Sequence, residues 1–222
     1  MTHGSGPATP FPPSIILASA SPRRRELLRS LGIEFEIVVP HVVEIIEGDP
    51  EQLVIENARR KARAGEDAVS NGRPTGAPAL VLGVDTEVVL DGRTMGKAAD
   101  RGAALARLEA LSARTHSVLS GVVVLSRSGG GAAEERSGVS RSEVTFRDLD
   151  AATIERYLAS GEWRDRAGAY AIQGLGSILV ERVEGDFSNV VGLPLRLLME
   201  LAPELLDGAG DSVSGEAPQT NP

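Results

Sequence analysis

The regular alternation of short apolar, strand-like runs with helix-like segments is the feature that most constrains the fold of this chain. Strands are expected over residues 15–18, 35–39, 80–83, 87–90, 117–125, 139–146 and 178–183. Helices are expected over residues 22–31, 50–70, 101–111, 151–160 and 194–206, most of them preceded by a Ser or Asp cap. This alternation predicts a mixed α/β fold and leaves the order of the strands open.

The composition excludes several classes of protein and of functional site. With 222 residues, of which 41% are hydrophobic, the chain can bury a substantial core. Cysteine is absent, which excludes disulfide bonds, thiolate catalysis and cysteine-ligated zinc. No apolar run reaches the roughly 18 residues that cross a membrane, and the first residues lack the basic start and apolar stretch of a signal peptide. These features predict a cytoplasmic protein with no membrane partner.

The two ends of the chain differ in composition from its body. Residues 1–14 and 207–222 are rich in small, polar and proline residues and are expected to be disordered tails, which leaves residues 15–206 as one folded domain. Residues 71–78 and 128–133 are expected to be loops. The formal net charge is −8, and because an acidic surface binds nucleic acid poorly, no nucleic-acid partner is expected. A polyphosphate ligand would need a local basic cluster, a metal ion, or both.

Lysine occurs only at Lys61 and Lys97, although the chain has 23 basic residues. Lysine offers a compact point charge to a phosphate and arginine a planar fork, so the two are not interchangeable in a tight site. A chain that otherwise uses arginine can therefore retain lysine where a compact ammonium group is required. The alternative is codon bias, with two lysines that have no special role.

The segment LASASPRR, residues 17–24, lies where the first expected strand gives way to a helix. Free backbone N–H groups and the positive end of the helix dipole favour an anion at such a helix N-terminus. Ser19 adds a hydroxyl group, and Arg23 and Arg24 add planar donors that match phosphate oxygens. The pattern indicates a phosphate site, and the alternative is an ordinary capped helix with solvated arginines.

A second segment places Asp85 at the end of an apolar strand, followed by Thr86. A carboxylate in this position can ligate magnesium or activate a water molecule. Residues 91–92, Asp-Gly, favour a hairpin turn, and Lys97 follows that hairpin, so it is expected beside Asp85. The alternatives are a turn aspartate that introduces the next strand and a surface lysine.

Two glycine-rich segments, residues 167–176 and 185–194, indicate close backbone approach, either to a ligand or between elements of the fold. Gln173 in the first of them has both a donor and an acceptor, which suits the edge of a nucleobase. Tight packing of the two loops is the alternative interpretation. A dinucleotide-binding domain is not favoured, because no strand is followed by G-x-G-x-x-G at the start of a helix.

Four segments in order, SASPRRRELLRSLG, VLGVDTEVVLDGRTMGK, AGAYAIQGLGS and GDFSNVVGLPL, resemble the signature segments of the Maf family. The resemblance covers nearly the whole chain from about residue 15 to residue 200. It implies an elongated, mixed-sheet α/β fold of the Maf/ITPase-like type with a central substrate cleft. It also implies hydrolysis of a nucleoside triphosphate to the monophosphate and pyrophosphate with a divalent metal ion (Mg or Mn), a cytoplasmic location and a homodimer.

The resemblance also assigns roles to individual residues. Asp85 matches the family's catalytic acid/base and, together with Glu44, is expected to hold the metal ion. The expected substrate-binding residues are Ser19, Arg23, Arg24, Lys61, Thr86, Lys97 and Gln173. Glu87 departs from the family pattern, in which an apolar residue is usual, and by strand alternation it should point to the same side as Asp85.

The motif variants favour the branch of the family that acts on dTTP and UTP. That branch typically reads D-T and A-Y-x-I-Q-G, as this chain does at residues 85–86 and 169–174, whereas the branch acting on 7-methyl-GTP reads D-Q and S-F-K-S-E-G. One methyl group in a pocket is worth only about 1–3 kcal/mol, so both pyrimidines are expected as substrates, with modified pyrimidine nucleotides as further candidates. The alternatives are the same chemistry on 7-methyl-GTP or another modified nucleotide, and a nucleotide-binding regulator of cell division.

Overall fold

The computed structural model describes residues 14–70, 79–127 and 133–207 of the chain. The expected tails and the expected loops over 71–78 and 128–133 lie almost entirely outside these residues, so those expectations stay predictions. Within the described residues, no helix is both long and apolar enough to cross a lipid bilayer.

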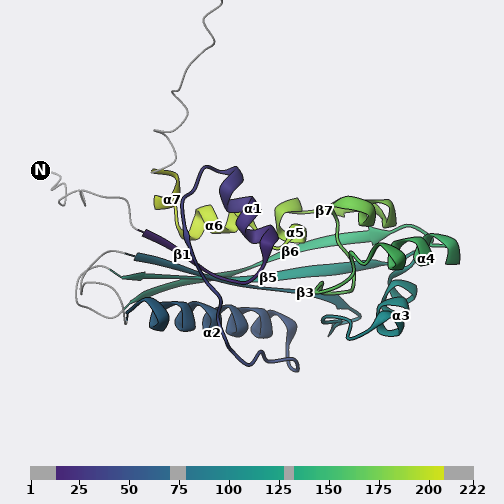
Figure 1. The fold of residues 1–222 in the computed structure, drawn as a ribbon, viewed down its shortest axis with the longest axis horizontal. Helices are drawn as coiled ribbons and strands as arrows, with labels where there is room; N and C mark the ends of the chain where they lie inside the picture. Colours follow the sequence, from purple (N-terminus) through teal and green to yellow (C-terminus); the bar gives the residue numbers. More distant parts are fainter. Residues whose placement is uncertain (1–13, 71–78, 128–132, 208–222) are drawn as a thin grey trace, which may run out of the picture.

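A seven-stranded mixed sheet forms the centre of the molecule, with strand order β2-β1-β3-β5-β6-β7 and β4 paired to β3. β1 pairs in parallel with β2 and β3, and the remaining pairs are antiparallel. The strands are β1 (Ser14–Ala18), β2 (Glu36–Val38), β3 (Ala79–Leu90), β4 (Arg93–Thr94), β5 (Thr115–Arg127), β6 (Glu134–Phe146) and β7 (Val180–Glu184). The long strands β3, β5 and β6 run along the longest axis of the molecule (Figure 1), so the expected elongated, mixed α/β fold is confirmed.

Helices cover both faces of this sheet. α2 lies along one face, whereas α1, α5, α6 and α7 lie on the other, and α3 and α4 are at the far end (Figure 1). Their bounds are α1 (Pro22–Ser30), α2 (Pro50–Ser70), α3 (Arg101–Leu111), α4 (Ala151–Ser160), the 3₁₀ helix η1 (Gly174–Leu179), α5 (Phe187–Val191), α6 (Leu195–Leu201) and α7 (Glu204–Asp207).

Local capping explains why several helices begin and end where the sequence predicts. The side chain of Asp100 accepts a hydrogen bond from the Ala103 N–H at the start of α3, and Asp150 does the same at the start of α4. α4 ends at Gly161, whose φ of 75° is the left-handed conformation that favours glycine. The first helix also begins at Pro22, as expected, although the hydroxyl group of its N-cap residue makes no capping bond.

The most consequential difference from the expected elements is β3. The sequence predicts two strands separated near Asp85, but the structure has one strand that continues through that residue. β5 pairs with β3 without interruption from Ala79 to Val89, and this long antiparallel partner keeps the intervening polar residues in the extended conformation. Asp85 therefore lies in the middle of a strand and not at its end, and it is not a turn aspartate.

The C-terminal region also differs in detail from the expected strand over 178–183 and helix over 194–206. The strand begins two residues later, because η1 precedes it and the carboxylate of Glu162 accepts hydrogen bonds from two N–H groups in its first turn. The helix divides into α6 and α7 at Pro203, which has no N–H to continue it. α5 was not expected, and the side chain of Asp186 caps its first N–H groups.

Two glycines let α2 approach the sheet closely. A Cβ atom on Gly83 would lie 2.2 Å from the carbonyl oxygen of Ala58, and one on Gly121 would lie 2.4 Å from that of Val54. The backbone of α2 therefore rests directly on β3 and β5, without the layer of side chains that usually separates a helix from a sheet. This contact fixes the distance between the backbone of Lys61 and the sheet, because Lys61 follows Ala58 by less than one helical turn.

One edge of β3 is left open in the middle of the strand. β1 pairs with β3 only as far as Gly83, and β4 pairs with it only at Val89 and Leu90. Between Val84 and Glu87, no described strand pairs with this edge. The candidate site lies at this gap.

Candidate active site

A cleft of about 570 Å³ opens at the gap along β3. Its floor is the central part of β3, around Asp85. One wall is residues 19–24, which comprise the link from β1 to α1 and the start of α1. Another contains Lys97 and residues 164–167, from the segment between α4 and η1. Segments distant in the sequence therefore meet here because the sheet places the end of β1 beside β3.

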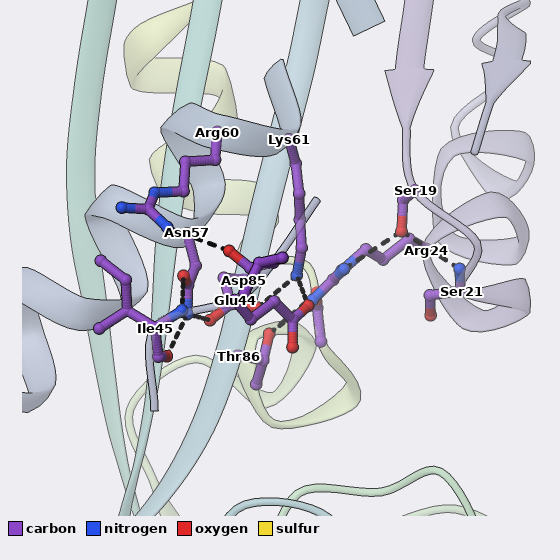
Figure 2. Close-up of polar contacts among 12 residues, drawn as sticks. Ser19, Ser21, Arg24, Glu44, Ile45, Asn57, Arg60, Lys61, Asp85 and Thr86 are labelled. Carbon is purple, nitrogen blue, oxygen red and sulfur yellow. Dashed lines mark hydrogen bonds and ion pairs between the residues drawn. The ribbon is translucent and has the colours of Figure 1, made fainter. Parts of the chain in front are cut away.

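Asp85, Lys61 and Glu44 form a connected cluster on this floor. Lys61 Nζ lies 2.5 Å from Asp85 Oδ1 and 2.5 Å from Glu44 Oε1. Asp85 and Lys61 are buried, with exposed fractions of 5% and 8%, whereas Glu44 is exposed. Figure 2 shows the three side chains pointing toward one another from β3, α2 and the segment before α2.

Asn57 completes the support of Asp85, and sequence reasoning missed it. Its Nδ2 donates to Asp85 Oδ2 at 3.3 Å and to the carbonyl oxygen of Ile45 at 2.9 Å. Asn57 precedes Lys61 by one helical turn, so both polar side chains project from the same face of α2. The only signal in the sequence was a polar residue on the buried face of this helix. Asn57 thus fixes both the catalytic candidate and the segment that carries Glu44.

Arg24 links three segments of the chain by hydrogen bonds from its guanidinium group. Its Nε donates to the carbonyl oxygen of Gly192 at 2.7 Å, Nη1 to Ser19 Oγ at 3.1 Å and Nη2 to Thr86 Oγ1 at 3.0 Å. Burial lowers the pKa of Arg24, and the negative charges of Asp85 and Glu44 oppose that shift. Three of its five N–H donors are already used, so Arg24 ties its own wall of the cleft to β3 and to Gly192 as well as lining the cleft.

Glu87 lies in the cleft with Asp85, as strand alternation predicts. Its Oε2 accepts a hydrogen bond from the Gly96 N–H at 3.2 Å. Burial, reinforced by the charges of Asp85 and then of Glu44, raises the pKa of Glu87 to about 7. The floor of the cleft therefore holds more negative charge than Lys61 alone neutralises.

Tyr170 forms part of the cleft wall and is supported from behind by His116. His116 Nε2 and the Tyr170 hydroxyl group share a hydrogen bond of 2.9 Å. Burial lowers the pKa of His116 to about 4, so the ring is neutral at physiological pH. A neutral, buried imidazole that contacts the back of the wall indicates a structural role for this residue.

The structure brings most of the predicted site residues together in the cleft. Those that line it are Ser19, Arg23, Arg24, Glu44, Lys61, Asp85, Thr86 and Lys97. Gln173 is the exception, because it is exposed at the start of η1 and does not line the cleft. Three lining residues that sequence reasoning missed, Arg164, Asp165 and Arg166, lie just before the glycine-rich segment that drew attention to this region.

Asp85 and Glu44 are the carboxylates expected to hold a divalent metal ion. Among residues 14–70, 79–127 and 133–207, His, Cys, Asp and Glu side chains form no group of three or more that could hold a metal ion. Asp85 and Glu44 nevertheless converge on one cation, the ammonium group of Lys61. Magnesium is usually bound by one or two carboxylates, with substrate phosphates and water as its other ligands. The residues present fit a metal ion that arrives with a polyphosphate better than a permanently bound one.

The chain is similar to known proteins along nearly its whole length. The model of the family described as Maf-like protein matches residues 14–205. A protein of Deinococcus radiodurans named dTTP/UTP pyrophosphatase is 47% identical, over 91% of this chain and 96% of its own length. Proteins with the same name from Anaeromyxobacter sp. and Alkalilimnicola ehrlichii are 46% and 43% identical, over 92% and 87% of this chain and 93% and 94% of their own lengths. Among solved structures, a HAM1 protein from Coxiella burnetii is 16% identical with a TM-score of 0.41 over 88% of this chain and 95% of its own, a weak likeness.

Proposed function

This chain belongs to the Maf family, and we propose that it is a nucleoside triphosphate pyrophosphatase that hydrolyses dTTP and UTP to the monophosphate and pyrophosphate. The observation that carries the proposal is the buried Asp85, held by Lys61 and Asn57 on the floor of an otherwise cationic cleft. The names and the near-complete coverage of the relatives support the choice of substrate.

The charge of the cleft suits a polyphosphate. The chain as a whole carries a net charge of −8, but six Lys and Arg side chains line the cleft against four Asp and Glu side chains. A local excess of positive charge in an acidic protein attracts an anionic substrate to one place. The cationic lining residues are Arg23, Arg24, Lys61, Lys97, Arg164 and Arg166.

In the proposed reaction a water molecule attacks the α-phosphorus of the nucleotide. Asp85 accepts a proton from this water as the new P–O bond forms, and the bond between the α-phosphorus and the bridging oxygen breaks, so that pyrophosphate leaves. Lys61 and Lys97 neutralise the negative charge that develops on the phosphates. A divalent metal ion (Mg or Mn), which Asp85 and Glu44 would hold, supplies further charge neutralisation when bound.

Specificity for pyrimidines rests on the residues around Thr86. This side chain contacts Arg24 and shares a hydrogen bond of 2.9 Å with Ser120 Oγ, so the hydroxyl group that we assign to the base is held in a fixed position. A pocket of this kind discriminates weakly against one methyl group, about 1–3 kcal/mol, which is why UTP accompanies dTTP in the proposal. Gln173 keeps its proposed role in substrate choice only if a nucleotide reaches beyond the cleft to the start of η1.

We also propose that the protein is cytoplasmic and forms a homodimer. The absence of cysteine suits the reducing cytoplasm. Exposed apolar side chains of β2 and of the segment between β2 and α2 offer a surface for a homodimer; they are Ile37, Val39, Val43 and Ile46. Light scattering of the purified protein measures its mass in solution, and a monomeric mass at micromolar concentration would rule the dimer out.

Release of pyrophosphate from a panel of nucleotides tests the proposed function. The protein is assayed with magnesium or manganese and dTTP, UTP, CTP, GTP, ATP or 7-methyl-GTP, and the products are identified. Turnover concentrated on dTTP and UTP is the expected result. Preference for 7-methyl-GTP or another purine would keep the chemistry and reject the specificity. Tight binding without turnover of any nucleotide would favour the regulator of cell division instead.

A further inference from the structure

The segment between α4 and η1 brings a second group of cations to the cleft. Arg164 and Arg166 from this segment line the cleft together with Lys97. Lys61 on the floor is paired with two carboxylates, whereas these three side chains have no carboxylate partner in the part of the chain that the structure describes. One wall of the cleft therefore carries positive charge that the protein itself does not neutralise.

The backbone of this wall is held firmly against β3. Lys97 and Ala167 form an isolated antiparallel bridge, which ties the segment to the loop after β4. Gly168 has a φ of 66°, and a Cβ atom there would lie 2.9 Å from a methyl group of Val88. The backbone that carries Arg166 is thus fixed within the cleft wall.

The side chain of Arg166 uses only one of its donors on the described part of the protein. Its Nε donates to the carbonyl oxygen of Glu162 at 3.2 Å, which is its one hydrogen bond within the described residues. Nη1 is shielded from solvent and finds no acceptor there, and burial lowers the pKa of this guanidinium group. A buried donor without an acceptor is unfavourable, and a phosphate oxygen in the cleft that this guanidinium group lines would supply the missing acceptor.

We propose that Arg166 is a substrate-binding residue that, beside Lys97, takes the phosphates that leave as pyrophosphate. The inference rests on the proposed function, because it presupposes a polyphosphate in the cleft. A guanidinium group can bind two phosphate oxygens at once, and the charge of the phosphates would neutralise the cations of this wall. A carbonyl oxygen of the base carries no charge and would not neutralise them. Arg24 on the other wall already donates three hydrogen bonds to the protein. One of them goes to Thr86, to which we assign a role in selecting the base. The nucleoside therefore belongs to that wall and the terminal phosphates to this one.

Calorimetric titration with the two products tests this placement. Arg166→Gln is titrated with inorganic pyrophosphate and, separately, with dTMP, each in the presence of magnesium. Pyrophosphate should bind about 10- to 100-fold more weakly than to the wild type, the effect of losing one charge-assisted hydrogen bond, while dTMP affinity should change by less than about twofold. Arg156→Gln, an exposed arginine on α4 outside the cleft, makes the same change of charge and should leave both affinities unchanged.

The possible outcomes separate this inference from the proposed function. Unchanged pyrophosphate affinity in Arg166→Gln, or an equal loss of dTMP affinity, overturns the placement even if the wild type hydrolyses dTTP. If Arg166→Gln loses affinity for pyrophosphate alone, and the wild type hydrolyses no nucleotide, the proposed function is rejected and the anion site is kept. Arg166→Lys retains the charge without the planar fork and should bind pyrophosphate with intermediate affinity. Because lysine disturbs packing less, this variant gives the answer if Arg166→Gln does not fold.

Discussion

Replacing Gly83 by alanine tests whether the close contact between α2 and β3 positions the proposed catalytic cluster of Asp85, Lys61 and Glu44. The added Cβ atom would lie 2.2 Å from the carbonyl oxygen of Ala58 and 2.7 Å from the backbone nitrogen of Ala62. Both partners are backbone atoms of α2, so a side-chain rotation cannot relieve the contact. Ordinary van der Waals contact begins at 3.4 Å, and α2 must therefore move away from the sheet by about 1 Å.

This displacement has a calculable effect on both stability and rate. Overpacking of this kind destabilises a protein by about 1–3 kcal/mol, which lowers the melting temperature by about 2–12 °C for a chain of this size. Ala58 and Ala62 bracket Lys61, whose Nζ lies 2.5 Å from Asp85, so the same movement separates the pair. A misplacement of about 1 Å in a catalytic group lowers the rate about 100-fold.

The assay measures pyrophosphate release and thermal unfolding in parallel for the wild type, Gly83→Ala and a control. Gly102→Ala is the control, because Gly102 is an exposed helical glycine whose added Cβ would meet only Asp100 Oδ1, at 3.4 Å. It should be neutral or slightly stabilising. If Gly83→Ala is folded at the assay temperature and keeps wild-type turnover, catalysis does not depend on the distance between α2 and the sheet.

Three further predictions follow from the floor of the cleft. Asp85→Asn should lower kcat by about 10²–10⁴-fold while the far-ultraviolet circular dichroism spectrum stays native, and undiminished turnover would remove Asp85 from catalysis. Chelation of divalent ions with EDTA should abolish turnover of dTTP, and added magnesium or manganese should restore it; a rate that resists EDTA would exclude the metal ion. Glu87 has a pKa raised above its ordinary value to about 7, so the folded state binds its proton more tightly and this contribution to stability is present below about pH 4.5 and lost as the pH rises through about 7. Urea unfolding of metal-free wild type should therefore lose about 1–3 kcal/mol between pH 5 and 8 relative to Glu87→Gln, and parallel profiles for the two proteins would contradict the assignment.

Much of the fold could be predicted because local signals decide it. Asp100 and Asp150 cap helices where their side chains can reach free N–H groups, and neither needs distant contacts to do so. The prediction of a break between two strands near Asp85 was wrong because distant contacts decide the structure there. Polar residues in a row favour a turn locally, but pairing with β5 along the whole strand outweighs that preference. Strand order could not be predicted, because it depends on which strands meet across long loops.

The candidate site shows the same division between local and distant information. Asp85, Lys61 and Lys97 could be found because unusual residue types stand at unusual places in the sequence. Asn57 could not, since a polar residue on a helix gives no sign of its partner until the helix is packed on the sheet. Arg166 could not either, because it is one of many arginines and only its place in the cleft wall, together with its unused donor, distinguishes it.

The open edge of β3 has a consequence for the behaviour of the protein in concentrated solution. An unpaired strand edge is a template on which another copy can add a strand, and proteins often protect such edges with inward-pointing charges. Asp85 and Glu87 occupy this stretch of β3, between the last residue paired with β1 and the first paired with β4. Their charges therefore discourage edge-to-edge association while they leave room for a small ligand. The same short stretch of β3 thus carries the proposed catalytic carboxylate of Asp85 and the charges that oppose strand addition.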